Sequence, residues 1–528
     1  MPIVQSGSLN TTALVVPDLY VQVVPPQNIT LNGVPSGRIG IVGTASWGPV
    51  NTPVICGSVA DYVRVFGPVR TSKYDAGTHV WTASQQGAQD FRVVRVTDGT
   101  DVAAGNFFNF TNSTNFSAAL NAKNTGTGGN RIQFGLSAGS AAGPSWKVTI
   151  GVPGQVPEVF DNIGGTGFTF WTNLVNAVNF GVGALRGPSQ LAVASIGSGV
   201  VSLALAPAVI PMTTLAGGTD GTTTITAAVL VGSDAATPKT GMYSLRSQGC
   251  ALLVVADADD STQWTTIDGF AQSESLYAIQ VGPKGDTISN AVTVKQAAGL
   301  DSYSSKLMFG DWLYWNDPTN SQQRIVSPQG FAAGRLANLS PEQSSLNKRL
   351  YSVVGSQKSG LPGSGAITQY STADLIALFQ AGLDVIANPA PGGAYWAVRD
   401  GHNSSSNAAV NGDNYTRMTN YIATTLQAGM GLYVGQVINA TLFRRVRSTL
   451  LSFFANMLGQ GLLGSTDGSL PYGVVCDISN NPLIRTSIGY LQADCQVQYQ
   501  GIVEKFIVNL EGGATVTVSR QTLPAGQV

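Results

Sequence analysis

Charged side chains are scarce in this chain. Of its 528 residues, 28 are Lys or Arg and 29 are Asp or Glu, which together make 11%, and only 2 are His. Soluble domains usually carry about 25% charged residues. So few His and carboxylate side chains leave little material for proton transfer, which argues against an enzyme. A surface with so little charge is weakly protected from association, so we expect a protein that packs against copies of itself.

Other absences narrow the class of protein further. The net charge of −1 gives no electrostatic argument for nucleic acid or an anionic membrane as a partner. The 4 cysteines form no CxxC pair, so we expect buried, reduced thiols and no zinc ribbon or dense disulfide framework. The start of the chain lacks the regions of a signal peptide, and no apolar run reaches the roughly 20 residues of a membrane span. We therefore expect an unsecreted protein, made in the cytoplasm, without direct membrane insertion.

Alternating strand and helix patterns predict a discontinuous α/β core with a mixed sheet and flanking helices. Before residue 105, the expected strands are 20–24, 38–44 and 91–96, and the expected helices are 58–66 and 78–86. After residue 217, the expected strands are 251–256, 276–281 and 306–314, and the expected helices are 261–273, 287–297, 415–432 and 443–458.

Between these two halves the composition changes. Residues 105–216 are rich in Gly, Ser, Thr and Asn, with few helix signals, and predict an inserted β-rich domain. Its expected strands are 131–135, 146–152, 168–171 and 200–205. The expected division is an N-terminal arm at 1–19, a core at 20–104 and 217–528, and a C-terminal subdomain from about 355 to 528 that ends in linking strands at 501–519.

Several short motifs could carry chemistry, and each has a simpler interpretation. Ser137 lies in a GxSxG string, but a strand follows it instead of the helix of a nucleophile elbow, which favours a hairpin. Residues 232–240 lack the second Gly and the Lys position of a P-loop. His79 and His402 have no neighbouring metal ligands, so we expect surface or helix-end positions. The acidic run that begins at Asp257 is expected to cap the following helix rather than bind a cation.

Ordered stretches along nearly the whole chain resemble the contractile tail sheath proteins of bacteriophages. Each is short, and their order carries the resemblance. They are Pro17-Asp-Leu-Tyr-Val-Gln-Val-Val, Gly40-Ile-Val-Gly43, Trp47-Gly-Pro-Val-Asn-Thr-Pro-Val54, Asp61-Tyr-Val-Arg-Val-Phe-Gly67, Phe91-Arg-Val-Val-Arg-Val96, Ala122-Lys-Asn-Thr-Gly-Thr-Gly-Gly-Asn130, Leu215-Ala-Gly-Gly-Thr-Asp-Gly221, Asp311-Trp-Leu-Tyr314 and Val326-Ser-Pro-Gln-Gly-Phe-Ala-Ala-Gly334. Leu350-Tyr-Ser-Val-Val354 departs from the family, which has a tryptophan there.

The resemblance implies a structural subunit that polymerises as stacked hexameric rings around a tail tube. Contraction would be a rigid-body rearrangement that drives the tube through the host envelope, with no cofactor, metal or nucleotide and no catalytic residue. The implied partners are further copies of the chain, the tail tube protein, and the baseplate and tail terminator proteins, within the tail of a virion assembled in the host cytoplasm.

The resemblance also implies that the two ends of the chain link neighbouring subunits by strand addition, because backbone hydrogen bonds at a free strand edge need no particular side chains. The linking residues expected in the N-terminal arm are Ala13, Leu14, Val15, Val16, Tyr20, Val21 and Val23. Those expected in the C-terminal strand are Ile502, Val503, Phe506, Ile507, Val508 and Leu510. Arg444 and Arg445 fall off the apolar stripe of the last helix, and together with Arg447 they are expected to face the tube. The simpler interpretation of these three arginines is a solvated helix face.

Two other interpretations stay open. The same architecture would serve a tailocin or a secretion-type injection system, and the large insertion favours a phage. An α/β enzyme with an unrecognised site is the second alternative, and substitutions at Ser137 or His402 would test it.

Overall fold

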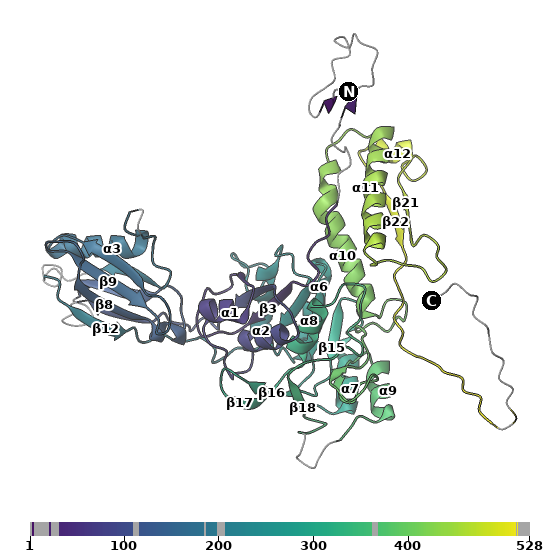
Figure 1. Ribbon diagram of the computed structural model, residues 1–528, viewed down its shortest axis with the longest axis horizontal. Helices are drawn as coiled ribbons and strands as arrows, with labels where there is room; N and C mark the ends of the chain where they lie inside the picture. Colours follow the sequence, from purple (N-terminus) through teal and green to yellow (C-terminus); the bar gives the residue numbers. More distant parts are fainter. Residues whose placement is uncertain are drawn as a thin grey trace, which may run out of the picture.

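The computed structural model describes residues 3–4, 21–22, 31–108, 116–183, 186–197, 206–361, 368–513 and 515. Its described part is elongated (Figure 1). A β-rich region lies at one end, a mixed α/β core in the middle, and two long helices project from the other side of the core.

A six-stranded sheet forms the centre of the core, in the order β15-β14-β13-β3-β5-β4. The strands from β15 to β5 are parallel, and only β4 runs antiparallel to its neighbour. Their bounds are β3 Ile39–Gly43, β4 Val54–Cys56, β5 Phe91–Arg95, β13 Leu252–Val255, β14 Tyr277–Val281 and β15 Ser305–Met308. Every residue of β3, β5, β13, β14 and β15 is buried, as in a parallel sheet that is covered on both faces.

Helices cover both faces of this sheet. Side chains such as Ile39 and Ile41 point to one face and pack with α1, α2 and α8, whereas Val42 points to the other and packs with α5 and α6. The helices are α1 Val59–Phe66, α2 Ala76–Gln85, α5 Ala227–Val231, α6 Ser261–Ser273, α7 Ile288–Ala298, α8 Gln329–Ala337 and α9 Thr372–Gln380. Ser58 and Asp260 cap α1 and α6 by accepting backbone N–H groups of the first turn, so the local sequence sets where these helices begin.

Small residues let α2 and α8 approach closely. A Cβ atom on Gly334 would lie 2.4 Å from the Cα atom of Ala83, and one on Gly330 would lie 2.1 Å from Thr82 Oγ1. Both distances are far below van der Waals contact, so only glycine allows α8 to lie at this depth against α2.

The described residues of 105–216 form two further sheets around a second hydrophobic cluster, which also includes Trp47 and Ala104. The sheet orders are β10-β9-β8-β12 and β11-β7-β6. The elements are β6 Gly105–Phe108, β7 Ala118–Ala122, β8 Gln133–Ala138, β9 Trp146–Gly151, β10 Glu158–Ile163, α3 Gly167–Phe180, β11 Ala192–Ile196 and β12 Ile210–Thr214. Arg95 ties this region to the core, because its buried guanidinium donates to Gly48 O and Thr125 O, each at 2.7 Å.

The C-terminal part contains a separate helical cluster. The elements that contribute to it are α10 (Asp413–Met430), α11 (Ala440–Gly459), β21 (Tyr472–Val475) and β22 (Asp494–Val497), together with Leu31 from the N-terminal side. The short helix α12 (Leu483–Thr486) follows β21 and buries none of its residues. The stripe expected on the second helix is buried in this cluster: Phe443, Val446, Leu450, Phe453, Phe454 and Met457. The remaining strands lie on the core: β16 Leu313–Asp317, β17 Gln322–Val326, β18 Val353–Ser356, β19 Ile386–Ala387 and β20 Ala397–Val398.

The structure corrects two expectations. Residues 168–171 belong to α3 rather than to a strand, because Phe170, Trp171, Leu174, Ala177 and Val178 bury one helical face. The expected strand 306–314 is two strands, β15 and β16, with residues 309–312 between them. Residues 502–510 pair with no described strand of this chain, and their expected pairing with a neighbouring copy stays a prediction. The expected strand 200–205 lies outside the described residues, and of 20–24 the structure describes Val21 and Gln22.

Candidate functional site

The C-terminal segment, described at residues 501–513 and 515, extends from the body without helix or strand. Its attachment begins at Gln500, whose carbonyl accepts from Asn414 Nδ2 at 2.9 Å and whose Nε2 donates to Gly461 O at 3.2 Å. From Gly501 to Gly513 the described chain forms neither helix nor ladder (Figure 1). The side chains expected to link subunits stand in solvent, and Phe506 and Leu510 are 84% and 91% exposed. A free backbone with apolar side chains on it is chemically suited to pair with a strand edge elsewhere.

Such an edge exists on the helical cluster. β21 and β22 form a two-stranded antiparallel sheet, and neither has a further partner among the described strands. The sheet packs on α11, where the rings of Phe454 and Tyr472 lie 5.7 Å apart. Two-stranded sheets are marginal on their own, so added strands would both satisfy the free edges and stabilise the sheet. This acceptor was missed in the sequence, because four-residue strands leave a weak pattern.

One contact holds the beginning of the C-terminal segment. His402 Nε2 lies 2.8 Å from Glu504 Oε1, and His402 Nδ1 lies 3.1 Å from Asp400 Oδ1. Burial lowers the pKa of His402, but the hydrogen bonds and charges of Asp400 and Glu504 outweigh it and raise the pKa to about 9. The imidazole is therefore a cation between two carboxylates at neutral pH. From the sequence we expected a surface or helix-end position for His402, and no local pattern indicated this pairing.

The N-terminal arm is described only in part. β1 (Ile3–Val4) and β2 (Val21–Gln22) pair in parallel, with Ile3 opposite Val21. Among the linking residues expected in the arm, Val21 is the one whose backbone is described. The others lie outside the described residues: Ala13, Leu14, Val15, Val16, Tyr20 and Val23. From Leu31 the chain runs along α10, where the Val34 N–H donates to Thr425 Oγ1 at 3.3 Å.

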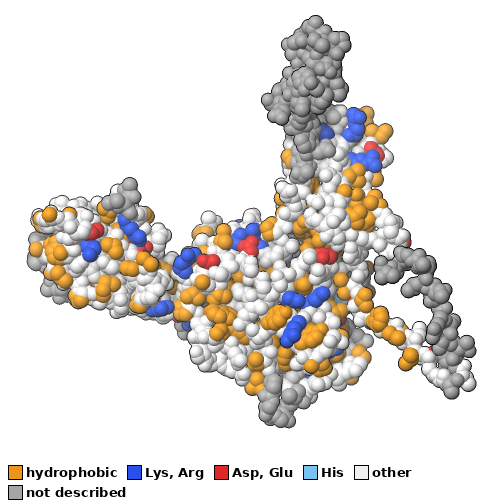
Figure 2. Space-filling model, in the orientation of Figure 1, with side chains coloured by type: hydrophobic (Ala, Val, Ile, Leu, Met, Phe, Trp, Pro, Cys, Tyr) orange, Lys and Arg blue, Asp and Glu red, His pale blue; other side chains and the backbone are white. Residues whose placement is uncertain are grey.

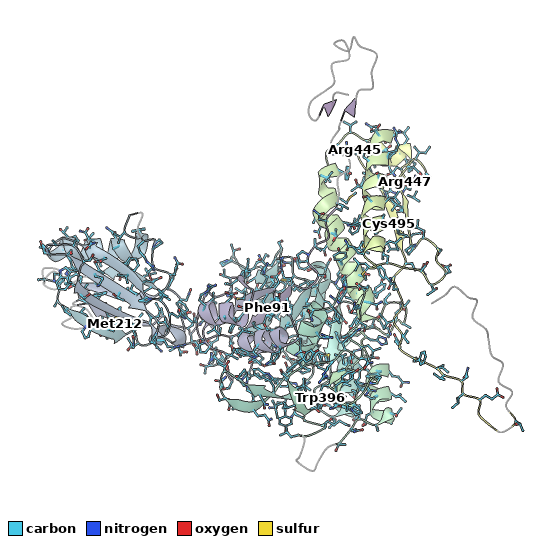
Figure 3. All side chains as sticks on the ribbon, viewed as in Figure 1. Phe91, Met212, Trp396, Arg445, Arg447 and Cys495 are labelled. Carbon is cyan, nitrogen blue, oxygen red and sulfur yellow. The ribbon has the colours of Figure 1, made fainter. Side chains whose placement is uncertain are left out.

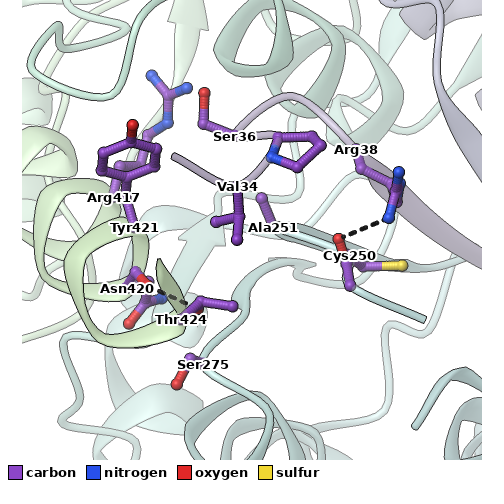
Figure 4. A pocket seen from close by; sticks show the side chains of 12 residues that line it. Val34, Ser36, Arg38, Cys250, Ala251, Ser275, Arg417, Asn420, Tyr421 and Thr424 are labelled. Carbon is purple, nitrogen blue, oxygen red and sulfur yellow. Dashed lines mark hydrogen bonds between the residues drawn. The ribbon is translucent and has the colours of Figure 1, made fainter. Parts of the chain in front are cut away.

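A small cavity lies where this incoming segment crosses α10 (Figure 4). It measures about 140 Å³, and its walls are mostly carbon, from Val34, Ala251, Tyr421 and their neighbours. The Nδ2 atom of Asn420 is buried on its wall with no described partner. The cavity marks an imperfect fit between the chain entering the core and the C-terminal helices.

The three expected tube-facing arginines share the exposed side of α11. Arg444, Arg445 and Arg447 are exposed, and none forms an ion pair with another described residue. Figure 3 shows Arg445 and Arg447 on the outer part of this helix. On the surrounding surface, charged side chains are few and scattered among hydrophobic and neutral polar ones (Figure 2). Three cations on the exposed side of one helix, without an ion pair among the described residues, can dock an acidic surface.

The motifs that resembled active sites have structural roles. Ser137 is on β8, which pairs with β9 as a hairpin, as expected. In the P-loop-like stretch, Lys239 and Arg246 both bind Asp234, at 2.5 and 2.7 Å. No group of His, Cys, Asp and Glu side chains among the described residues could hold a metal ion. No helix in the described ranges has the length and apolar character of a membrane span.

His79 corrects a further expectation. It is 1% exposed on α2, and its Nε2 atom lies 3.1 Å from Asp257 Oδ1. Burial raises the pKa of Asp257, but the charge and hydrogen bond of His79 outweigh it and hold the pKa below its usual value. Of the acidic run, Asp260 caps α6 as expected, whereas Asp257 is a buried partner of His79. Cys56, Cys250 and Cys476 are buried as expected, and Cys495 is exposed.

The fold resembles solved sheath structures over most of the chain. No family model and no curated protein sequence matches it. A sheath tail protein from Listeria innocua is 13% identical, with a TM-score of 0.58 over 85% of this chain and 90% of that one. One from Desulfitobacterium hafniense is 14% identical, with a TM-score of 0.55 over 86% and 93%. The contracted sheath of the PVC extracellular contractile injection system is 11% identical, with a TM-score of 0.54 over 96% and 99%. The fold of this chain is that of the contractile tail sheath proteins.

Proposed function

We propose that this chain is the structural subunit of a contractile sheath that stacks as hexameric rings around a tail tube. The observation that carries the proposal is the exposed segment 501–513, which pairs with no described strand, on a body with the sheath fold. Apolar side chains as exposed as Phe506 and Leu510 are costly in water, and burial in a neighbouring copy removes that cost. The low fraction of charged residues in the whole chain also favours association with further copies of the chain.

The chain divides into parts with different tasks in this proposal. Residues 1–19 are a linking arm, 105–216 are an inserted domain on the outside of the lattice, and the core is 20–104 with 217–528. We start the C-terminal unit at α10 rather than near residue 355, because α9 shares its hydrophobic cluster with α6 and α7. The expected linking strands at 501–519 remain part of this unit.

Neighbouring copies are joined by strands in this arrangement. The C-terminal segment and the N-terminal arm of other subunits add to the open edges of β21 and β22. Contraction then moves subunits as rigid bodies about these links, from an extended lattice to one that buries more surface. The free energy comes from the additional interface, so no nucleotide or cofactor takes part.

The proposed partners follow from the exposed surfaces. Arg444, Arg445 and Arg447 face the tail tube protein, and ring ends contact baseplate and tail terminator proteins. A bacteriophage virion is the setting we favour, since the inserted domain is larger than a compact sheath requires. The sheath of a tailocin or another injection system is the alternative, supported by the likeness to the PVC sheath.

Negative-stain electron microscopy of the purified chain tests the proposal. We expect hollow tubes or rings from the full chain. Variants that lack residues 1–19 or 502–528 should remain folded monomers, as judged by size-exclusion chromatography and circular dichroism. Dispersed monomers from the full chain under all assembly conditions would contradict a sheath, and tubes from both truncated variants would contradict linking by the two ends.

A further inference from the structure

Glu504 makes the last ion pair between the described C-terminal segment and the body. Beyond it, residues 505–513 and 515 of the described chain form no hydrogen bond or ion pair with the rest of the molecule. The path taken by everything that follows therefore depends on how the chain is held at Glu504.

The partner of Glu504 sits on a rigid support. His402 is fixed from behind by Asp400, so its Nε2 atom points outward to the segment. Its carbonyl oxygen accepts a hydrogen bond from the buried Lys306 Nζ at 2.9 Å. Lys306 in turn binds Asp384 and Asp413, both inside the core. His402 is thus a fixed anchor, and Glu504 is the movable half of the pair.

Shape alone does not hold the segment in place. Residues 502–505 lie against an open groove of about 480 Å³ whose other walls include Asn347, Phe379 and Pro391. Val503 is 75% exposed there, so its side chain contributes little packing. A groove this roomy admits several paths, and the ion pair selects one of them.

We propose that His402 and Glu504 form a releasable latch that sets the direction in which the C-terminal segment leaves the body toward a neighbouring copy. The proposal rests on the linking function given to this segment. When the latch is closed, the segment leaves the body in one fixed direction. When it is open, the segment can turn at Gly501 while subunits move past each other. The charged groups around the imidazole are Asp400 and Glu504, which contact it, and Lys306, Asp384 and Asp413 behind it. Arg399 and Lys505 line the same groove.

Limited trypsin digestion of the unassembled full chain measures how readily the latch opens. Lys505 and Arg520 are the only tryptic sites after Arg485. Cleavage after Lys505 needs a locally released chain, and Arg520 serves as an internal reference. We expect His402→Gln to raise the Lys505 rate relative to the Arg520 rate by roughly threefold to tenfold, as loss of one partly exposed pair would. This variant leaves the sequence around the cleavage site unchanged. Unchanged relative cleavage in a folded His402→Gln protein would overturn the latch.

Further variants keep the test decisive. If His402→Gln does not fold, Glu504→Gln takes its place, with Glu511→Gln on the same segment as the matched control. Glu504→Gln should raise the relative rate and Glu511→Gln should not; equal effects would overturn the proposal. The wild-type ratio should also rise from pH 7 to pH 10 as the imidazolium loses its proton, and a flat ratio would count against the latch. Electron microscopy of the same proteins separates the two proposals, since tube formation tests linking and cleavage tests the latch.

Discussion

The ammonium group of Lys306 lies 2.6 Å from the carboxylate of Asp384, and the two side chains are 0% and 2% exposed. Asp413, the first residue of α10, lies 3.1 Å from the same ammonium group and also accepts from Tyr277 Oη at 2.6 Å. Burial lowers the pKa of Lys306, but the two carboxylates outweigh it and raise the pKa to about 12. This cluster joins the sheet edge, the loop before His402 and the helical cluster, so it fixes the frame that carries the C-terminal segment.

Replacing the buried cation should be costly. Lys306→Met leaves two buried carboxylates without their cation, and we expect the free energy of unfolding to fall by about 3–5 kcal/mol. Lys73→Met is the matched control, because Lys73 also binds a carboxylate at 2.9 Å but is 45% exposed. Its loss should stay below about 1 kcal/mol. Urea unfolding followed by circular dichroism measures both, and equal losses would show that the cluster adds nothing.

The close contact of α8 with α2 predicts opposite effects for two glycine substitutions. Gly334→Ala forces a Cβ atom into the backbone of Ala83 and should destabilise the protein by about 1–3 kcal/mol. Gly269→Ala on α6 meets no atom within 4 Å and should stabilise the protein by about 0.5–1 kcal/mol, because alanine favours the helix. Thermal unfolding of the two variants checks the signs, and a stabilising Gly334→Ala would refute the packing described here.

Stability should depend on pH through His402. Its pKa is raised in the folded state to about 9, so its contribution is complete below the ordinary value of 6.5 and is lost as the pH rises through 9. Because the pair with Glu504 is partly exposed, we expect the loss to be about 1–2 kcal/mol. Urea unfolding from pH 6 to pH 10 should show this decline in the wild type and a weaker one in His402→Gln. Identical profiles would mean that the imidazole is not held as a cation.

The C-terminal segment should matter for assembly and not for the fold. Phe506→Asp with Val508→Asp places charge on the face expected to pair, and we expect tube formation to be lost. The monomer's melting temperature should change by less than about 2 °C, because both side chains are exposed and touch no core. Val156→Asp, at another exposed apolar position, is the control and should still form tubes. Tubes from the double variant, seen by electron microscopy, would exclude this face from the contact.

Much of the core could be predicted from the sequence, because local periodicity carries it. The expected helix 261–273 matches α6, and the apolar stripe that begins at Phe443 is the buried face of α11. The alternation of strands and helices likewise predicted the mixed α/β fold. In each case, the pattern of apolar residues along one segment decides which face is buried.

Contacts between residues that are distant in sequence could not be predicted from local periodicity. The aromatic run 168–171 looked like a strand in a short window, and only the partners further along show it as part of α3. His79 and Asp257 are distant in sequence, as are His402 and Glu504, and no local signal marks either pair. The division between α9 and α10 also depends on which cluster each helix joins.

The sequence by itself determined the composition of the surface, the secondary structure of the core and the apolar alternation of the C-terminal segment. These follow from side-chain size, polarity and spacing, which act over a few residues. The tertiary structure alone decided that Lys306, Asp384 and Asp413 meet, that β21 and β22 have edges paired by no described strand, and that Glu504 is held by His402. Such features depend on segments that are distant in sequence and are brought together by packing. Burial then makes an unpaired charge or an unpaired backbone group costly, so these groups need partners.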